Sequence, residues 1–236
     1  MSIKTRKIFP LLFFLSFFLC LQNIHAFDID ITGKEAGVYF KGEYNRSFYW
    51  YGDISIIGAV ELNNKFTFKG GFLYGKTNYD TDIKAFTGAR FDPWADKPLN
   101  LSLSYIYNGL PEYEVHSHTI LPVISYNAKW AGIGVGTSFR FTSFFGEPAV
   151  FESLLSFSGY VNFINNEKLR LGISCANFSD FHAGNMGSYS LGLNSVIHIN
   201  RKWSVINDFE LMQSGSTGLS ATFYGISWRG GMKFTW

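Results

Sequence analysis

Charged residues, cysteine and long apolar runs are all scarce in this sequence. Charged residues make up 16% of the chain, against about 25% in a typical soluble domain. The two cysteines, Cys20 and Cys175, are too few for a disulfide framework. After residue 26, no segment reaches the roughly 18 apolar residues that indicate a membrane-spanning helix. These features argue against an ordinary soluble domain, a disulfide-stabilised domain and a helical membrane protein.

The one long apolar run lies at the start of the chain and has the layout of a secretory signal peptide. A basic segment precedes apolar residues 8–21, and Ala26 occupies the position of a cleavage site. We expect a cleaved signal peptide over residues 1–26 and an exported domain over residues 27–236. Cleavage leaves 17 basic and 18 acidic residues, a formal charge of −1, which gives no indication of a nucleic-acid partner.

The rest of the chain is rich in aromatic residues, at 19%, and alternates with a period of two. In residues 99–108, LNLSLSYIYN, leucine and tyrosine alternate with asparagine and serine. Residues 169–177, LRLGISCAN, and 190–199, SLGLNSVIHI, follow the same pattern. Because successive side chains of a strand point to opposite faces, these segments predict strands with one apolar and one polar face.

Five similar turns divide the strands at regular intervals. Each contains Asn or Asp, then a lysine, then a bulky residue, and the lysines are Lys65, Lys97, Lys129, Lys168 and Lys202. Asn and Asp favour the backbone conformations of tight turns. The lysines lie 32 to 39 residues apart, which suits two membrane-spanning strands of about 9–11 residues and a connecting loop. Six such hairpins predict twelve strands.

The segment at 84–94 is the weakest of the twelve, because Pro93 interrupts an already poor alternation. Loss of one hairpin would give ten strands, the alternative that keeps the even number found in bacterial single-chain barrels. The expected strands lie at residues 27–44, 47–62, 65–76, 84–94, 97–108, 113–126, 129–142, 149–163, 168–178, 187–199, 202–213 and 218–236.

The two faces of these strands differ in chemistry. One face carries the charges, and the other is aliphatic in mid-strand and aromatic near the ends. This arrangement predicts an all-β fold, a transmembrane antiparallel up-and-down β-barrel with short periplasmic turns. The candidate lumen-lining residues are Asp53, Glu61, Lys69, Arg140, Glu152, Arg170, Asp208, Glu210, Arg229 and Lys233. The candidates for an aromatic girdle at the membrane interface are Tyr126, Phe163, Trp203, Trp228, Phe234 and Trp236.

The C-terminal segment YGISWRGGMKFTW resembles the C-terminal signature of bacterial outer-membrane β-barrel proteins. In that class a final amphipathic strand ends on an aromatic residue, and Trp236 stands here where phenylalanine is more usual. The resemblance implies that this strand closes the barrel and is read by the outer-membrane assembly machinery. It also implies contact with outer-membrane lipid, in a bacterium with two membranes. It identifies the general class and no particular activity.

Two functions suit a barrel of this size, because twelve strands lie between barrels filled by side chains and wide aqueous channels. The leading hypothesis is a small passive, porin-like channel for small solutes. In the alternative, the lumen charges pair and fill the interior, giving a closed structural or surface-antigen barrel. The loop at residues 179–187 is the longest expected on the outer side, and we expect it to be too short to fold into the lumen as a constriction.

A lipid-modifying hydrolase is a second alternative, which we do not favour. Glu114, His116 and His118 share one face of a strand and Ser117 lies on the other, so the nucleophile and base would not meet. The chain also lacks the His-x-Ser arrangement of outer-membrane phospholipases and lipid A deacylases. The same three residues form a weak metal motif. We therefore expect no catalytic residues, no metal site and no cofactor.

Overall fold

The computed structural model describes residues 34–45, 50–63, 65–77, 81–94, 97–145, 147–184, 188–214 and 222–236. The expected signal peptide and the first residues of the expected first strand lie outside these ranges. Within them, no helix combines the length and the apolar character needed to cross a membrane.

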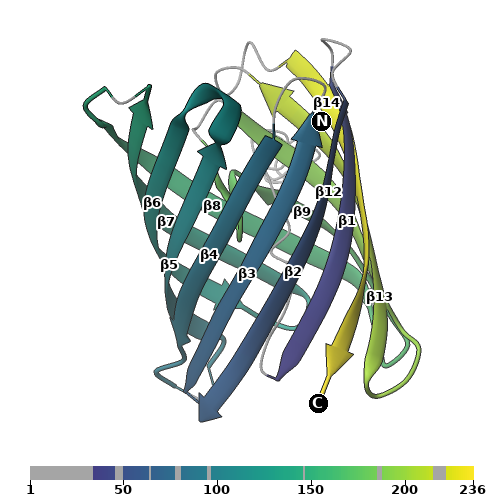
Figure 1. Ribbon diagram of the computed structural model, residues 1–236. Helices are drawn as coiled ribbons and strands as arrows, with labels where there is room; N and C mark the ends of the chain where they lie inside the picture. The colour runs from purple at the N-terminus through teal and green to yellow at the C-terminus, as the bar shows by residue number, and fades with distance from the viewer. Residues whose placement is uncertain are drawn as a thin grey trace, which may run out of the picture.

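Twelve antiparallel strands form a closed barrel, and Figure 1 shows how strongly they tilt. Each strand pairs with its neighbours along the chain, and the first strand pairs with the last. The wall consists of β1 (Glu35–Asn45), β2 (Trp50–Asn63), β3 (Phe66–Thr77), β4 (Thr81–Phe91), β5 (Leu99–Leu110), β6 (Val115–Asn127), β7 (Ala131–Phe144), β8 (Val150–Asn165), β9 (Leu169–Ala176), β12 (Ser188–His198), β13 (Trp203–Ser214) and β14 (Thr222–Thr235). The prediction of twelve strands is confirmed.

The doubtful segment at 84–94 is a wall strand, so the ten-stranded alternative is wrong. It corresponds to β4, which pairs with β3 on one side and β5 on the other. The strand ends at Phe91, before Pro93, and so avoids the proline. Its alternation is poor because apolar Phe86 is buried on the inner face, where the pattern requires a polar residue.

Three of the recurring turns share one hydrogen-bond pattern, which explains their similar sequences. The Asn63 side-chain oxygen accepts hydrogen bonds from the main-chain N–H groups of Lys65 and Phe66, both at 2.9 Å. Asn166 and Asn200 accept the equivalent pairs of bonds, at 2.8 to 2.9 Å. Such side-chain acceptors stabilise a tight turn locally. These short turns are therefore stabilised by hydrogen bonds between their own residues.

The C-terminus lies at the same end of the barrel as these short turns (Figure 1). The Trp236 N–H donates to the Lys34 carbonyl at 3.0 Å, and Glu35 forms an ion pair with Lys233 at 3.0 Å. The first strand is thus paired along its length with the last, which removes the exposed edges of an open sheet.

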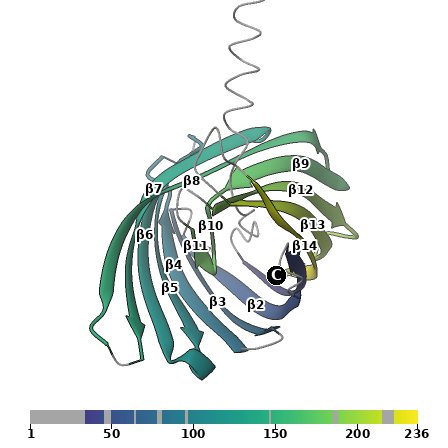
Figure 2. The same ribbon diagram turned by 90° about the horizontal axis from the view of Figure 1, so that it is seen from above.

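Two further short strands lie inside the barrel, β10 (Phe178–Ser179) and β11 (His182–Ala183). They pair with each other, and Figure 2 shows them within the ring of wall strands. The expectation that this loop is too short to enter the lumen is therefore wrong. The reason is that β9 leaves the wall after 8 residues, whereas β8 has 16. The loop begins well below the rim, so a few residues suffice to enter the lumen.

Candidate functional site in the barrel lumen

The ten charged residues assigned to the lumen all occupy strand positions of the inward-facing set. In β2, for example, Ile57 and Ala59 are buried whereas Ile56 and Val60 are exposed on the outer surface. Asp53 and Glu61 share the parity of the buried residues, and neighbouring side chains of one parity share a face. The same relation holds for Lys69, Arg140, Glu152, Arg170, Asp208, Glu210, Arg229 and Lys233.

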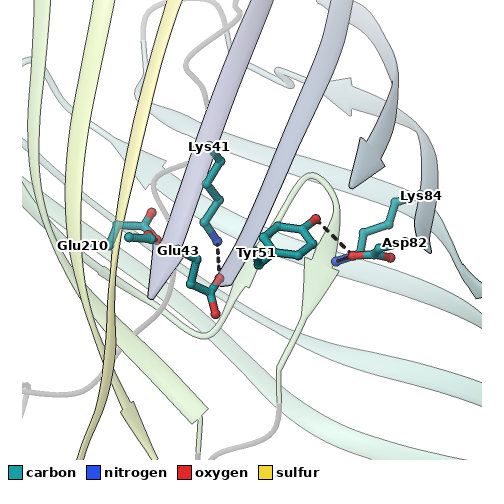
Figure 3. Close-up of polar contacts among 7 residues, drawn as sticks. Lys41, Glu43, Tyr51, Asp82, Lys84 and Glu210 are labelled. Atoms are coloured by element: carbon teal, nitrogen blue, oxygen red, sulfur yellow. Dashed lines mark hydrogen bonds and ion pairs between the residues drawn. The ribbon is translucent and has the colours of Figure 1, made fainter. Parts of the chain in front are cut away.

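Six more charged residues of the described strands share this inner face and are not among the ten candidates. They are Glu35, Lys41, Glu43, Asp82, Lys84 and Arg90. Lys41 pairs with Glu43 at 3.1 Å and Lys84 with Asp82 at 2.8 Å, while the Tyr51 hydroxyl donates to Asp82 at 3.1 Å (Figure 3). Asp82 lies before the expected boundary at residue 84. Alternation with apolar Val38 and Phe40 is the signal that could have identified Lys41.

Arg229 lies at the centre of the charged wall. It pairs in register with Asp208 on β13 and with Lys41 on β1. Its guanidinium interacts electrostatically with four carboxylates, those of Glu210, Asp208, Asp53 and Asp180. Asp208 also accepts a hydrogen bond from Asn194 at 3.3 Å. Ionic groups thus continue across neighbouring strands of this wall, and opposite charges limit the cost of burying each one.

Residues 177–184, which we call the lumen segment, start from the wall at Asn177. This side chain is fully buried. Its amide nitrogen donates to the Leu155 carbonyl, and its amide oxygen accepts from the Phe157 N–H, both at 2.8 Å. The Asn177 side chain therefore continues the pairing to β8 beyond the point where β9 ends.

The far side of the lumen segment contacts β3 and β4. The Lys69 ammonium lies 2.6 Å from an Asp180 carboxylate oxygen. The Phe181 ring packs edge-on against Phe86, with 4.9 Å between ring centroids. In the strand order of the barrel, β3 lies six strands from β9 in either direction. The lumen segment therefore spans the barrel from one wall to the opposite wall.

Apolar side chains occupy the lumen at this height. Phe178, Phe181 and Ala183 of the lumen segment are at most 7% exposed. They belong to one cluster with inward-facing wall residues, namely Tyr39, Ile57, Ala59, Leu73, Phe86, Ile106, Leu121, Val123, Val196 and Ile206. Expecting a polar inner face, we did not predict this layer. Inward apolar positions in the middle of several strands were the available signal.

Most of the girdle candidates lie beside the short turns on the outer surface. Tyr126, Phe163, Trp203 and Trp236 are about half exposed, and Phe234 packs against Trp203 at 4.8 Å between ring centroids. Trp228 is placed differently. It lies in the middle of β14, opposite Phe209 of β13, and its indole N–H donates to Asn207.

The histidine pair lies on the outer surface near the longer loops. His116 and His118 are exposed, and their Nδ1 atoms hydrogen-bond with the hydroxyls of Tyr107 at 2.9 Å and Tyr105 at 2.7 Å. Ser117 is buried on the opposite face, so the strand separates it from both histidines. In the part of the chain that the structure describes, no three His, Cys, Asp or Glu residues form a group that could hold a metal ion.

Two smaller features of the wall concern Gly132 and Cys175. A Cβ atom on Gly132 would collide with the Tyr160 ring, whose hydroxyl donates to the Ala128 carbonyl at 3.0 Å. The glycine therefore leaves space for a large side chain on the neighbouring strand. Cys175 is half-buried on the outer face and, like Phe157, packs against the buried residues Ala176 and Tyr189.

No protein-family model and no curated protein sequence matches the chain. Solved structures match its fold. The NanC porin has a TM-score of 0.57 at 10% identity, covering 84% of this chain and 100% of its own. The COG4313 outer membrane channel from Pseudomonas putida F1 has a TM-score of 0.56 at 9% identity, covering 89% and 98%.

The translocator domain of the autotransporter NalP from Neisseria meningitidis has a TM-score of 0.54 at 13% identity, covering 89% of this chain and 90% of its own. At these identities the likeness concerns the fold alone. This likeness in fold, together with the closed wall, the apolar outer surface and the charged inner face, supports one conclusion. The chain is a twelve-stranded transmembrane β-barrel with the fold of bacterial outer-membrane proteins.

Proposed function

We propose that this protein is a channel for small polar solutes in the outer membrane of a diderm bacterium. The observation that carries the proposal is the ionic lining of the barrel. Asp208, Glu210 and Lys233 are buried inside it, and Arg229 interacts with carboxylates from several strands. Burying ionic groups in a permanently dry interior costs more free energy than filling it with apolar side chains. In a channel, these ionic groups line a solute path and are hydrated when that path is open.

The structural neighbours support this proposal at the level of fold. NanC and KdgM are named porins, and the COG4313 protein is named an outer membrane channel. A barrel of twelve strands is also intermediate between the smallest filled barrels and the wide porins. A narrow path for small solutes is therefore the expected scale. The expected environment is outer-membrane lipid, reached through the barrel assembly machinery after signal-peptide cleavage near Ala26.

The proposal is tested by recording currents from refolded protein in a planar lipid bilayer. Folding is checked first, by comparing gel mobility before and after heating. We expect discrete conductance steps, separated by closed intervals because an apolar layer occupies the lumen. Arg170→Gln should change the step size, since Arg170 lies on the inner face. The matched control is Lys202→Gln at an exposed turn, which should leave the step size unchanged.

The apolar layer favours a second candidate function, a closed barrel that serves as a membrane scaffold or surface antigen. This candidate predicts a folded protein that stays silent in the bilayer, whichever lumen residue is changed. A folded barrel that stays silent even after its lumen segment has been released from the wall would contradict the channel proposal. That result would support the scaffold function. The lipid-hydrolase alternative has less support, because His116 and His118 bond to tyrosines on the outer face and Ser117 faces inward.

A further inference from the structure

We propose that the lumen segment is a movable plug, and that its contact with β3 and β4 holds the channel closed. The inference rests on the proposed channel function and adds how that channel is regulated. It identifies Lys69 and Asp180 as the latch, Phe181 as the apolar contact that seals it, and Asn177 as the fixed point about which the segment moves.

The lumen segment is built as a unit that can move without unfolding. Phe178 pairs with Ala183 and Ser179 with His182 in a miniature hairpin. The Gly184 N–H closes its base by donating to the Asn177 carbonyl at 2.6 Å. These bonds lie within the segment, so they persist when its tip leaves the opposite wall. Movement requires no break in the hydrogen-bond ladders of the barrel.

The two ends of the segment are attached in different ways. At its base, Asn177 forms two side-chain bonds to the main chain of β8, and its N–H donates to the Phe157 carbonyl at 3.1 Å. At its tip, the described contacts with the opposite wall are made by side chains, through Asp180 and Phe181. Side-chain contacts are remade more readily than a main-chain ladder. The tip is therefore the end that is released.

The cationic wall residues keep attractive partners when the tip of the lumen segment moves away from β3 and β4. Arg229 loses its interaction with Asp180 but keeps Glu210, Asp208 and Asp53, which all belong to wall strands. The Lys69 ammonium lies 5.7 Å from the centre of the Phe86 ring, so a cation–π contact remains available to it. Release thus leaves Lys69 and Arg229 with attractive partners on the wall.

The first experiment measures the fraction of time that single channels stay open in a planar bilayer. Asp180→Asn and Lys69→Gln should each increase this fraction several-fold over the unmodified protein. The exchanged pair, Lys69→Asp with Asp180→Lys, should return it toward the original value. Lys41→Gln is the matched control, because it removes an inner-face cation paired with Glu43 at 3.1 Å and outside the latch. It should alter step size but leave the open fraction unchanged.

The second experiment fixes the tip to the wall. Phe86→Cys and Phe181→Cys are combined with Cys175→Ser, so that the only thiols in the exported domain are the two facing positions. A short bifunctional thiosulfonate reagent should abolish openings when it bridges the two cysteines. A reducing agent should restore them. Each single-cysteine variant, treated identically, should continue to open.

The outcomes separate the two proposals. If bridged and unbridged barrels conduct alike, and latch variants leave the open fraction unchanged, the plug inference is wrong while the channel proposal stands. If every folded variant is silent, including Asp180→Asn and Lys69→Gln, the channel proposal is wrong and the plug inference fails with it. Openings that stop on bridging and return on reduction would support both.

Discussion

At the residue scale, Asn177 is the position on which the lumen segment most depends. Its amide group is both donor and acceptor to the β8 main chain, and it lies fully buried. Aspartate could reproduce the acceptor but not the donor, and a shorter side chain could reproduce neither. One asparagine thus allows β9 to end early without leaving adjacent buried main-chain groups of β8 unpaired.

Asn177→Ala should therefore destabilise the barrel. It leaves the Leu155 carbonyl and the Phe157 N–H without these partners, and each unsatisfied buried group costs about 1–3 kcal/mol. The measurement is the free energy of unfolding in urea, in lipid vesicles. Asn165→Ala is the control, because Asn165 also bonds to a carbonyl, that of Lys129, but at an exposed position. Equal losses for the two variants would contradict the role assigned to Asn177.

At the scale of elements, the short turns show how a sequence repeat becomes structure. Asn200→Ala removes two hydrogen bonds to the main chain of its turn, and we expect a loss of about 1–3 kcal/mol at roughly 0.5–1.5 kcal/mol per bond. Asn200→Asp keeps the acceptor oxygen and should retain most of the stability. The urea unfolding midpoint measures both variants. A larger loss for aspartate than for alanine would show that the side-chain acceptor does not stabilise the turn.

The elements also show which parts of the fold were predictable from sequence. Alternation and repeated turns are local features of the sequence, so twelve strands and their two faces can be located from them. The expected start of β4 at residue 84 nevertheless excludes Asp82, which belongs to the strand. The lumen segment could not be located in this way. Its position depends on the early end of β9 and on Asn177 reaching β8, and both depend on the strand register. The apolar residues that receive it, such as Ile57 and Phe86, look like breaks in the alternation until the segment is known to pack on them.

At the scale of the whole molecule, the barrel is held closed by the pairing of β1 with β14. The ion pair of Glu35 and Lys233 lies on this junction, with a distance of 3.0 Å and side chains only 10% and 9% exposed. Thr235 also donates from its hydroxyl to Glu35, at 3.3 Å. The two charges come from residues about 200 positions apart in sequence, so their contact forms only when the barrel closes.

Removing one charge of this pair should therefore destabilise the closed barrel more than removing both. Glu35→Gln or Lys233→Met alone leaves a buried charge without its main partner, which typically costs about 3–5 kcal/mol. In the double variant neither charge remains, so the loss should be smaller than for either single variant. The measurements are the urea unfolding free energy of all four proteins and the temperature at which the compact gel band is lost. If the losses of the two single variants simply add in the double variant, the charges are not coupled and closure depends on main-chain pairing alone.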